Sequence, residues 1–197
     1  YSTYKALAKD EPVKVNDLTY EVVLRDGAKF SDGTEVKAAD VVNSFEKNMA
    51  DDTYKAFLTF IDTVTAKDEK TVSFTLKYPF EALLKNRLSV VKIFPASLTA
   101  DQLKTMPIGT GPWKYDKING DDGGTITFKP NDQYNGSLPA TCKEMSWNVL
   151  LDNTSRTTAI TDGSVLAIEG VPDANAKQIA NSGASVEYVP SFALPFL

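Results

Sequence analysis

The residues of this sequence that could carry acid-base, nucleophilic or metal chemistry are not arranged in the patterns that such chemistry requires. Histidine is absent from its 197 residues, which removes the commonest general base, the commonest metal ligand and the Ser-His and Cys-His pairs of many hydrolases. Adjacent acids occur at 51–52, 68–69 and 121–122, but each pair stands in a polar, turn-like stretch, where solvated loop charge is expected rather than a catalytic dyad. No spacing of serine and lysine, or of carboxylates, favours a nucleophile or a metal site. We therefore expect no enzyme, no bound metal and no cofactor.

One glycine-rich segment, Pro-Ile-Gly-Thr-Gly-Pro-Trp-Lys-Tyr at 107–115, could suggest a phosphate-binding loop. It lacks both the Lys-Ser/Thr ending of such a loop and a long helix after it. Its two glycines, Gly109 and Gly111, and its two prolines, of which Pro112 is the second, instead predict a tight crossing of the backbone before a strand that starts at Trp113. We interpret this segment as architectural.

The composition is that of an ordinary globular chain. The formal net charge is -5, and the 21 lysine and arginine residues are spread along the sequence, which argues against nucleic acid or an anionic membrane as a partner. Hydrophobic residues make up 42% of the chain, but no apolar run approaches the roughly 20 residues of a transmembrane helix. Cys142 is the only cysteine, so it cannot form an intrachain disulfide, and we expect a buried or half-buried apolar role for it.

The segment from 19 to 49 predicts a strand, two turns and a helix in succession. The strand is Thr19–Leu24, and Asp-Gly turns follow it at 26–27 and 32–33. Val41, Phe45 and Met49 then recur at a spacing of four, which indicates a helix from about Val36 that packs on a sheet. We interpret the aspartates and glycines as turn and cap chemistry rather than ligand contacts. The structural residues of this run are Gly27, Phe30, Asp32, Gly33 and Asp40.

The rest of the chain predicts interleaved helices and strands. In the first half we expect a short helix near 53–61, a hairpin of 62–66 with 71–76, a helix after Pro79, an extended segment at 89–94, a helix capped by Thr99 and a hairpin from 113 to 128. In the second half we expect a buried strand at 145–151, a helix from 153 or 154 to Gly163, a strand at 165–168, a helix after Pro172 and a strand at 185–189. This alternation predicts a partly parallel sheet with helices as crossovers.

Two of these segments together resemble a known family. The run from Leu24 to Phe45 is similar to the "LRDGVKFSDGTPVTAEDVVYSFER" stretch of the extracellular solute-binding proteins of peptide and nickel ABC importers (solute-binding protein family 5). The segment 107–115 resembles their "P(V/I)GTGPY(K/R)" loop, and 128–136 resembles the "RNPDYWGG"-like stretch that follows it. Residues 156–168 resemble the helix and strand around "GEID" more loosely, because the acidic pair of that motif is missing here.

The resemblance implies a fold class and a division of the chain. A family member is far longer and has two lobes that close over a ligand, so we expect an α/β (mixed α+β) fragment with the periplasmic-binding-protein-like type II fold. Residues 1–106 would form a mixed α/β accessory domain, whose N-terminal residues lead in from the first lobe, and 107–197 part of the first ligand-binding lobe. The second lobe would be absent. The apolar end 191–197 would be an exposed, aggregation-prone segment if nothing covered it, so we expect that a strand or hinge follows it.

The resemblance also implies a function in binding rather than in catalysis. In this family the binding protein captures a peptide or similar small solute outside the membrane, closes by a hinge motion and delivers the solute to the permease. By rough position, the candidate contacts are Tyr54, Phe57, Val91, Lys92, Ser191 and Phe192. For Tyr54 and Phe57 the helical spacing favours core positions over ligand contacts, and Lys92 is either a partner for an acidic terminus or a solvated strand lysine.

The expected partners and location follow from the same resemblance. The partners are the solute and the membrane permease of an ABC importer, and we expect a monomer. The protein would be extracytoplasmic, either periplasmic or anchored to the outer face of the cell membrane as a lipoprotein. The alternative function is a non-transport surface sensor or interaction lipoprotein that uses the same fold.

Overall fold

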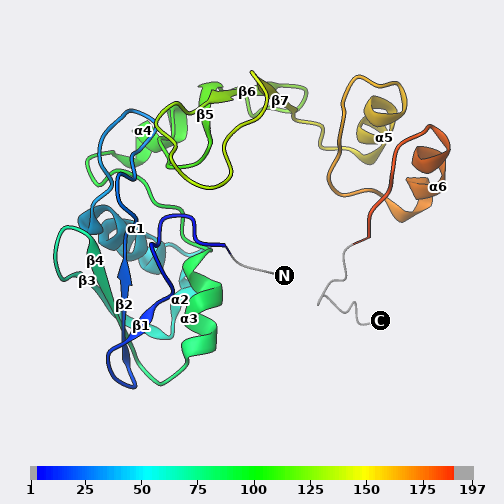
Figure 1. The fold of residues 1–197 in the computed structure, drawn as a ribbon. Helices are drawn as coiled ribbons and strands as arrows, with labels where there is room; N and C mark the ends of the chain where they lie inside the picture. Colours follow the sequence, from blue (N-terminus) through cyan, green and yellow to red (C-terminus); the bar gives the residue numbers. More distant parts are fainter. Residues whose placement is uncertain (1–3, 189–197) are drawn as a thin grey trace. The chain divides into compact units, whose positions relative to one another are not determined.

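The computed structural model describes residues 4–188 and divides the chain into two compact units (Figure 1). Within the described residues, the first unit comprises 4–118 and 127–146, and the second comprises 119–126 and 147–188. The mixture of helices and strands confirms the predicted α/β (mixed α+β) class. The functional division into 1–106 and 107–197 stays a prediction.

The first unit is built on a four-stranded antiparallel sheet with the order β1-β2-β4-β3. Its strands are β1 (Val13–Lys14), β2 (Thr19–Val23), β3 (Ile61–Ala66) and β4 (Thr71–Leu76). Phe74 of the central strand β4 lies opposite Tyr20 on one side and Val64 on the other. Alternate residues of β4 are buried, as the period of two predicts, because one face of the sheet packs on the core.

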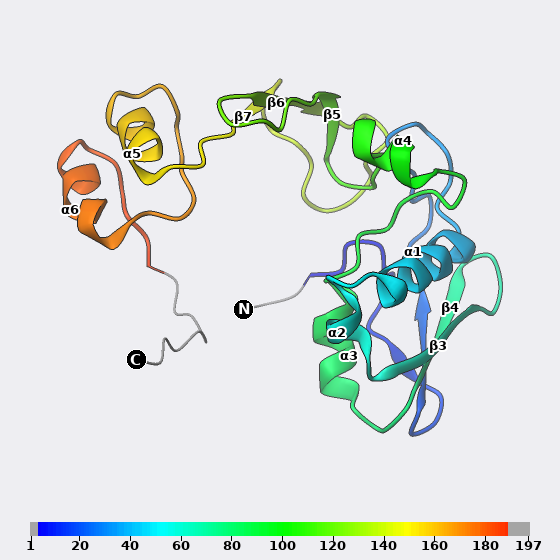
Figure 2. The ribbon, with the colours of Figure 1, turned by 180° about the vertical axis from the view of Figure 1, so that it is seen from behind.

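Helix α1 (Ala38–Ala50) packs against β3 and β4 of this sheet (Figure 1 and Figure 2). Val41 and Phe45 lie on its buried side, as the sequence predicts, and the Phe45 ring meets Phe74 edge to face with 5.0 Å between the ring centroids. Helices α2 (Lys55–Leu58) and α3 (Glu81–Leu88) complete this part of the unit. The largest fully buried side chains of this unit are Tyr20, Phe30, Phe45, Phe60, Phe74, Leu58, Ile61, Leu76, Leu84, Val36 and Val72.

A second, three-stranded sheet has the order β5-β6-β7, with β5 at Trp113–Lys117, β6 at Thr125–Pro130 and β7 at Met145–Asn148. Helix α4 (Ala100–Thr105) precedes it and begins at the predicted cap, where Thr99 and Gln102 form a capping box. The predicted hairpin is confirmed, since β5 and β6 pair antiparallel with Tyr115 opposite Phe128.

The second unit contains α5 (Asn153–Thr161) and α6 (Asp173–Asn181), which contact each other. Asp152 caps α5 by accepting a hydrogen bond from the N–H of Ser155 at 2.8 Å, one residue before the predicted cap. The pKa of Asp152 is held below its ordinary value by hydrogen bonds from the Ser155 side chain and backbone. No helix among residues 4–188 is long and apolar enough to cross a membrane.

Several predicted strands of the C-terminal half are wrong. Residues 165–168 and 185–188 form no strand, and 89–94 in the first half is a loop. A strand needs a neighbour to satisfy its backbone N–H and C=O groups, and none of these segments has one in the described part of the chain. The predicted parallel sheet with helical crossovers is therefore not formed by them. The strand at 145–148 exists, but it is largely exposed rather than buried, and Trp147 is 56% exposed.

Candidate functional site

The two aromatic candidates lie at α2 and are exposed. Tyr54 precedes the helix and is 41% exposed, and Phe57 lies within it and is 43% exposed. The expectation that helical spacing places them in the core is wrong, because Leu58 and Ile61 take the buried side of this segment. Arg87, near the end of α3, lies 5.0 Å from the centroid of the Phe57 ring, which is a cation–π distance.

The candidates of the 89–94 loop differ in what they offer to a solute. Val91 is 5% exposed and belongs to the core, so its side chain is out of reach of a solute. Lys92 is exposed, and its Nζ donates a hydrogen bond to the C=O of Ser89 at 3.2 Å. It is a loop residue rather than a strand lysine. Ser191 and Phe192 lie outside the described residues.

Two separate contacts lie near the end of α3. Arg87 covers Phe57, and Lys92 bonds Ser89, which caps the C-terminus of α3. We call Phe57, Arg87 and Lys92 the α3-end cluster. Neither cation makes a salt bridge with a residue of the described part, and cations are favoured near a helix C-terminus. These residues supply two positive charges and an aromatic ring, which are groups that suit a carboxylate attached to an apolar group. No motif or spacing marks Arg87 in the sequence.

The two family-like motifs meet in the first unit through backbone groups. The N–H of Ser31 donates to the C=O of Gly109 at 2.9 Å. The side chain of Asn131 donates to the C=O of Gly111 at 2.8 Å, and its N–H donates to the C=O of Pro112 at 2.8 Å. Neither glycine has a positive φ, and a Cβ atom at either would meet nothing within 4 Å. The segment 107–115 therefore contacts its neighbours through its carbonyl groups.

The turn residues of the first motif have the geometry that turn chemistry requires. Gly27 and Gly33 have φ angles of 67° and 91°, in the left-handed region that favours glycine. Asp32 accepts hydrogen bonds from the N–H and hydroxyl of Thr34 at 2.9 and 2.7 Å. Asp40 accepts from the N–H of Lys37 and from the N–H of Ala96, so it caps α1 and holds a distant loop.

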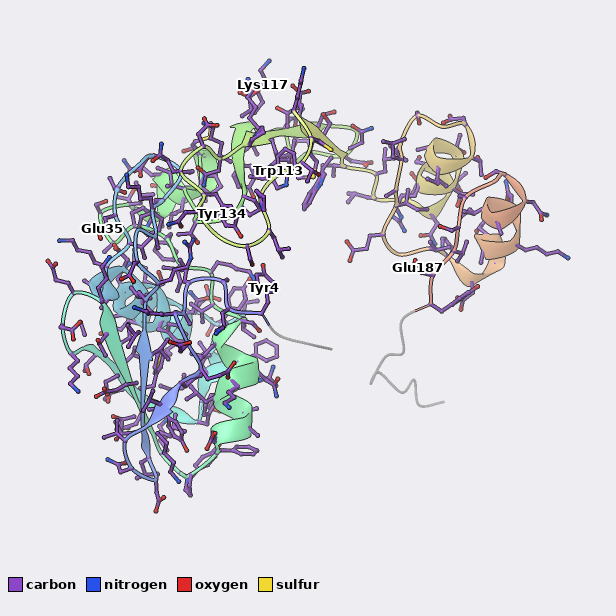
Figure 3. All side chains as sticks on the ribbon, in the orientation of Figure 1. Tyr4, Glu35, Trp113, Lys117, Tyr134 and Glu187 are labelled. Carbon is purple, nitrogen blue, oxygen red and sulfur yellow. The ribbon has the colours of Figure 1, made fainter. Side chains whose placement is uncertain are left out.

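Asn135 ties the first turn to the stretch after β6. Its Nδ2 donates to the C=O of Gly27 at 3.0 Å and to the C=O of Asp26 at 3.2 Å. The guanidinium of Arg25 lies 5.8 Å from the centroid of the Tyr134 ring, and Figure 3 shows Tyr134 on the loop beyond β6. We call the segments 25–34, 107–115 and 131–136 the motif junction. Its contacts are architectural, because they join backbone carbonyls of one segment to side chains of another.

Each unit has a hollow within the described residues. The hollow of the second unit has a volume of 360 Å³ and is lined by Asn148, Leu150, Thr154, Ser155, Thr158, Ala159, Asp162 and Ser164. The pKa of Asp162 is lowered by the backbone N–H of Ser164, so this polar hollow keeps a negative charge. The hollow of the first unit, 430 Å³ in volume, lies beside α2. The predicted ligand residues that the structure describes, which are Tyr54, Phe57, Val91 and Lys92, do not line either hollow. No acidic or cysteine cluster among residues 4–188 could hold a metal ion.

Comparison with known proteins gives a consistent match. A family model described as "Bacterial extracellular solute-binding proteins, family 5 Middle" matches residues 2–197. The glutathione-binding protein GsiB of Pectobacterium atrosepticum is 32% identical over 181 residues, which are 87% of this chain and 34% of that protein. GsiB of Escherichia coli K12 is 30% identical over 167 residues, 80% of this chain and 32% of that protein. The chain thus spans about a third of the length of these curated relatives.

Solved structures give the same match. The binding protein AgaA of A. tumefaciens R10, in complex with agropinic acid, is 31% identical with a TM-score of 0.75 and is matched over 89% of this chain and 37% of its own. The oligopeptide-binding protein AppA of Bacillus subtilis, in complex with a nonapeptide, is 25% identical with a TM-score of 0.71, over 88% of this chain and 36% of its own. These likenesses bear out the predicted periplasmic-binding-protein-like type II fold.

Proposed function

This chain belongs to the bacterial extracellular solute-binding proteins of family 5, and from that premise we propose that it is part of the substrate-binding component of an ABC importer. The intact protein captures a peptide or similar small solute outside the membrane and delivers it to a membrane permease. The observation that carries the proposal is the family match over residues 2–197. The matched relatives are binding proteins rather than enzymes.

The proposed solute carries a carboxylate. Glutathione, agropinic acid and a nonapeptide are the ligands named for the relatives, and each bears at least one carboxylate group. We propose that the α3-end cluster contributes to holding such a group, with Lys92 and Arg87 as the cations and Phe57 as the apolar wall. Tyr54, the backbone at Val91, and Ser191 and Phe192 are further proposed contacts.

We also propose a separate role for each part of the chain. Residues 1–106 serve as the accessory domain and 107–197 as part of the first ligand-binding lobe, and the second lobe lies in the part of the intact protein that this chain does not span. Members of the family are extracytoplasmic. We propose that the intact protein acts as a monomer and is either periplasmic or held at the outer face of the membrane by a lipid anchor.

Calorimetric titration of the intact protein with glutathione, a nonapeptide and agropinic acid tests this proposal. At least one of the three should bind with a stoichiometry of one. The Lys92→Gln variant should bind it about fivefold more weakly, since an exposed ion pair contributes up to ~1 kcal/mol. Lys104→Gln is the matched control, because Lys104 pairs with Asp101 on the exposed helix α4. Equal affinity of both variants would refute the role of Lys92, and no binding of any carboxylate solute would refute the proposed function.

A further inference from the structure

A hollow beside α2 has the construction of a small-molecule site that differs from the α3-end cluster. It is lined by Met49, Lys55, Ala56, Leu58, Thr59, Ile61 and Lys77, and we call it the α2 hollow. These residues come from the end of α1, from α2, from the start of β3 and from the residue after β4. Its volume of 430 Å³ falls in the range of about 300–1,000 Å³ that is common for ligand pockets.

The floor of the α2 hollow is apolar and well fixed. Leu58 and Ile61 are each 1% exposed and belong to the core of the first unit, and Met49 packs half-buried against the same core. A buried floor keeps its shape because the residues below it are close-packed. Methionine adds an unbranched, polarizable wall that adapts to an aliphatic chain.

The charge at the rim of the α2 hollow is positive. Lys55 and Lys77 are its only ionisable lining residues. Lys55 pairs with Asp52, whereas Lys77 makes no salt bridge within residues 4–188 and is exposed. An apolar floor beneath a lysine that has no carboxylate partner complements a molecule with an aliphatic tail and one negative charge.

We propose that the α2 hollow binds a small aliphatic monocarboxylate, with its chain on Met49 and Ala56, above the buried Leu58 and Ile61, and its carboxylate paired with Lys77. Phe57, Arg87 and Lys92 do not line this hollow, so the proposal is independent of the solute site proposed above. The ligand class is that of a medium-chain fatty acid, for which octanoate is the probe.

The three methionines of the sequence make the test direct. The chain of residues 1–197 is labelled with ¹³C-methyl methionine and titrated with octanoate, and methyl spectra are recorded. The Met49 signal should shift and saturate, because Met49 lines the hollow. Met106, after α4, and Met145, in β7, lie outside the hollow and are internal controls whose signals should not move. Octylammonium, which has the same tail and the opposite charge, should leave Met49 unchanged.

Two variants test separately the charge of Lys77 and the shape of the α2 hollow. Ala56 is an exposed lining residue of α2, so Ala56→Trp should fill the hollow without disturbing the core and should abolish the saturable shift. Lys77→Gln should weaken octanoate binding about threefold, the scale of one exposed ion pair. The proposal is overturned if octanoate moves all three methyl signals alike, if Met49 does not move up to millimolar octanoate, or if both variants bind as the unaltered chain does. Each of these results would leave solute capture by the intact protein unaffected.

Discussion

The contact between Asn135 and the turn at Gly27 allows a quantitative prediction about the motif junction. Gly27 has φ = 67°, and a Cβ atom built on it would lie 3.1 Å from Nδ2 of Asn135. Gly27→Ala therefore strains the backbone and also pushes away the amide that bonds the carbonyls of Gly27 and Asp26. Both effects should appear in the free energy of unfolding of the first unit.

The magnitude follows from two separate costs. An alanine in the left-handed region destabilises the folded state by about 1–2 kcal/mol. Alanine also lowers the conformational entropy of the unfolded chain, which stabilises the folded state by about 0.4–1 kcal/mol. The net loss of stability is about 1 kcal/mol. Loss of the hydrogen bonds of Asn135 adds about 1 kcal/mol. We therefore expect about 2 kcal/mol for Gly27→Ala and about 1 kcal/mol for Asn135→Ala. The double variant should also lose about 2 kcal/mol, because the hydrogen bonds are lost only once, so the coupling is about 1 kcal/mol.

Urea unfolding followed by the amide NMR signals of Val72 and Phe74 measures this coupling, because both residues lie in β4 at the core of the first unit. Gly33→Ala is the matched control. Its φ is 91°, but its Cβ atom would only touch the Gln133 side chain at an ordinary 3.9 Å. The costs of Gly33→Ala and Asn135→Ala should therefore add. Additive costs for Gly27→Ala and Asn135→Ala would refute the reasoning.

Three further predictions concern the core, a helix cap and the response to acid. Phe74→Ala should lower the free energy of unfolding by about 3–5 kcal/mol, because Phe74 is 1% exposed. The control is Tyr78→Ala, at a residue that is 47% exposed. In the same urea assay it should change the free energy of unfolding by no more than about 0.5 kcal/mol. Asp152→Ala should remove the cap of α5 and raise the hydrogen-exchange rates of its amides by an amount equivalent to about 1 kcal/mol; unchanged rates would show that the cap is not needed. A hydrogen bond from Lys70 lowers the pKa of Glu35 below its ordinary value of 4.5, so its contribution to stability is full above that value and is lost as the pH falls through the lower, folded pKa. The difference in stability between the unaltered chain and Glu35→Gln should therefore shrink on acidification from about pH 6 to about pH 3, and a constant difference would contradict the pairing.

Local sequence patterns predicted the elements of the first unit well, because the period of a helix or strand face is set by residues two to four positions apart. The alternation of β4 and the spacing of Val41 and Phe45 in α1 both mark faces that pack on the same core. The Thr99 cap is local chemistry, since it needs only the residue three positions later. Such features depend on neighbours in sequence, and the structure confirms them.

Sequence patterns did not predict the features that depend on a partner distant in the chain. Segments 165–168 and 185–188 have the composition of strands, but composition supplies no neighbouring strand for them. The helical spacing of Tyr54 and Phe57 correctly grouped them with Leu58, but spacing cannot tell which part of an apolar face is covered. The contact of Asn135 with Gly27 spans 108 positions and carries no local signal.

The candidate site was predictable only in part for the same reason. Lys92 was singled out by position and proves to be an exposed cation, whereas Val91, its neighbour, is buried. Arg87 joins Phe57 through the packing of α3 beside α2, and no motif marks it. The ligand roles of these residues stay predictions until a solute is bound.

The central claim, that this chain serves to capture a solute, is tested most directly by native mass spectrometry of the intact protein purified without refolding. We expect a mass above that of the polypeptide by one small molecule, and denaturing release of a peptide or another carboxylate solute. An empty protein that also stays empty after incubation with glutathione, peptides and agropinic acid would contradict the claim.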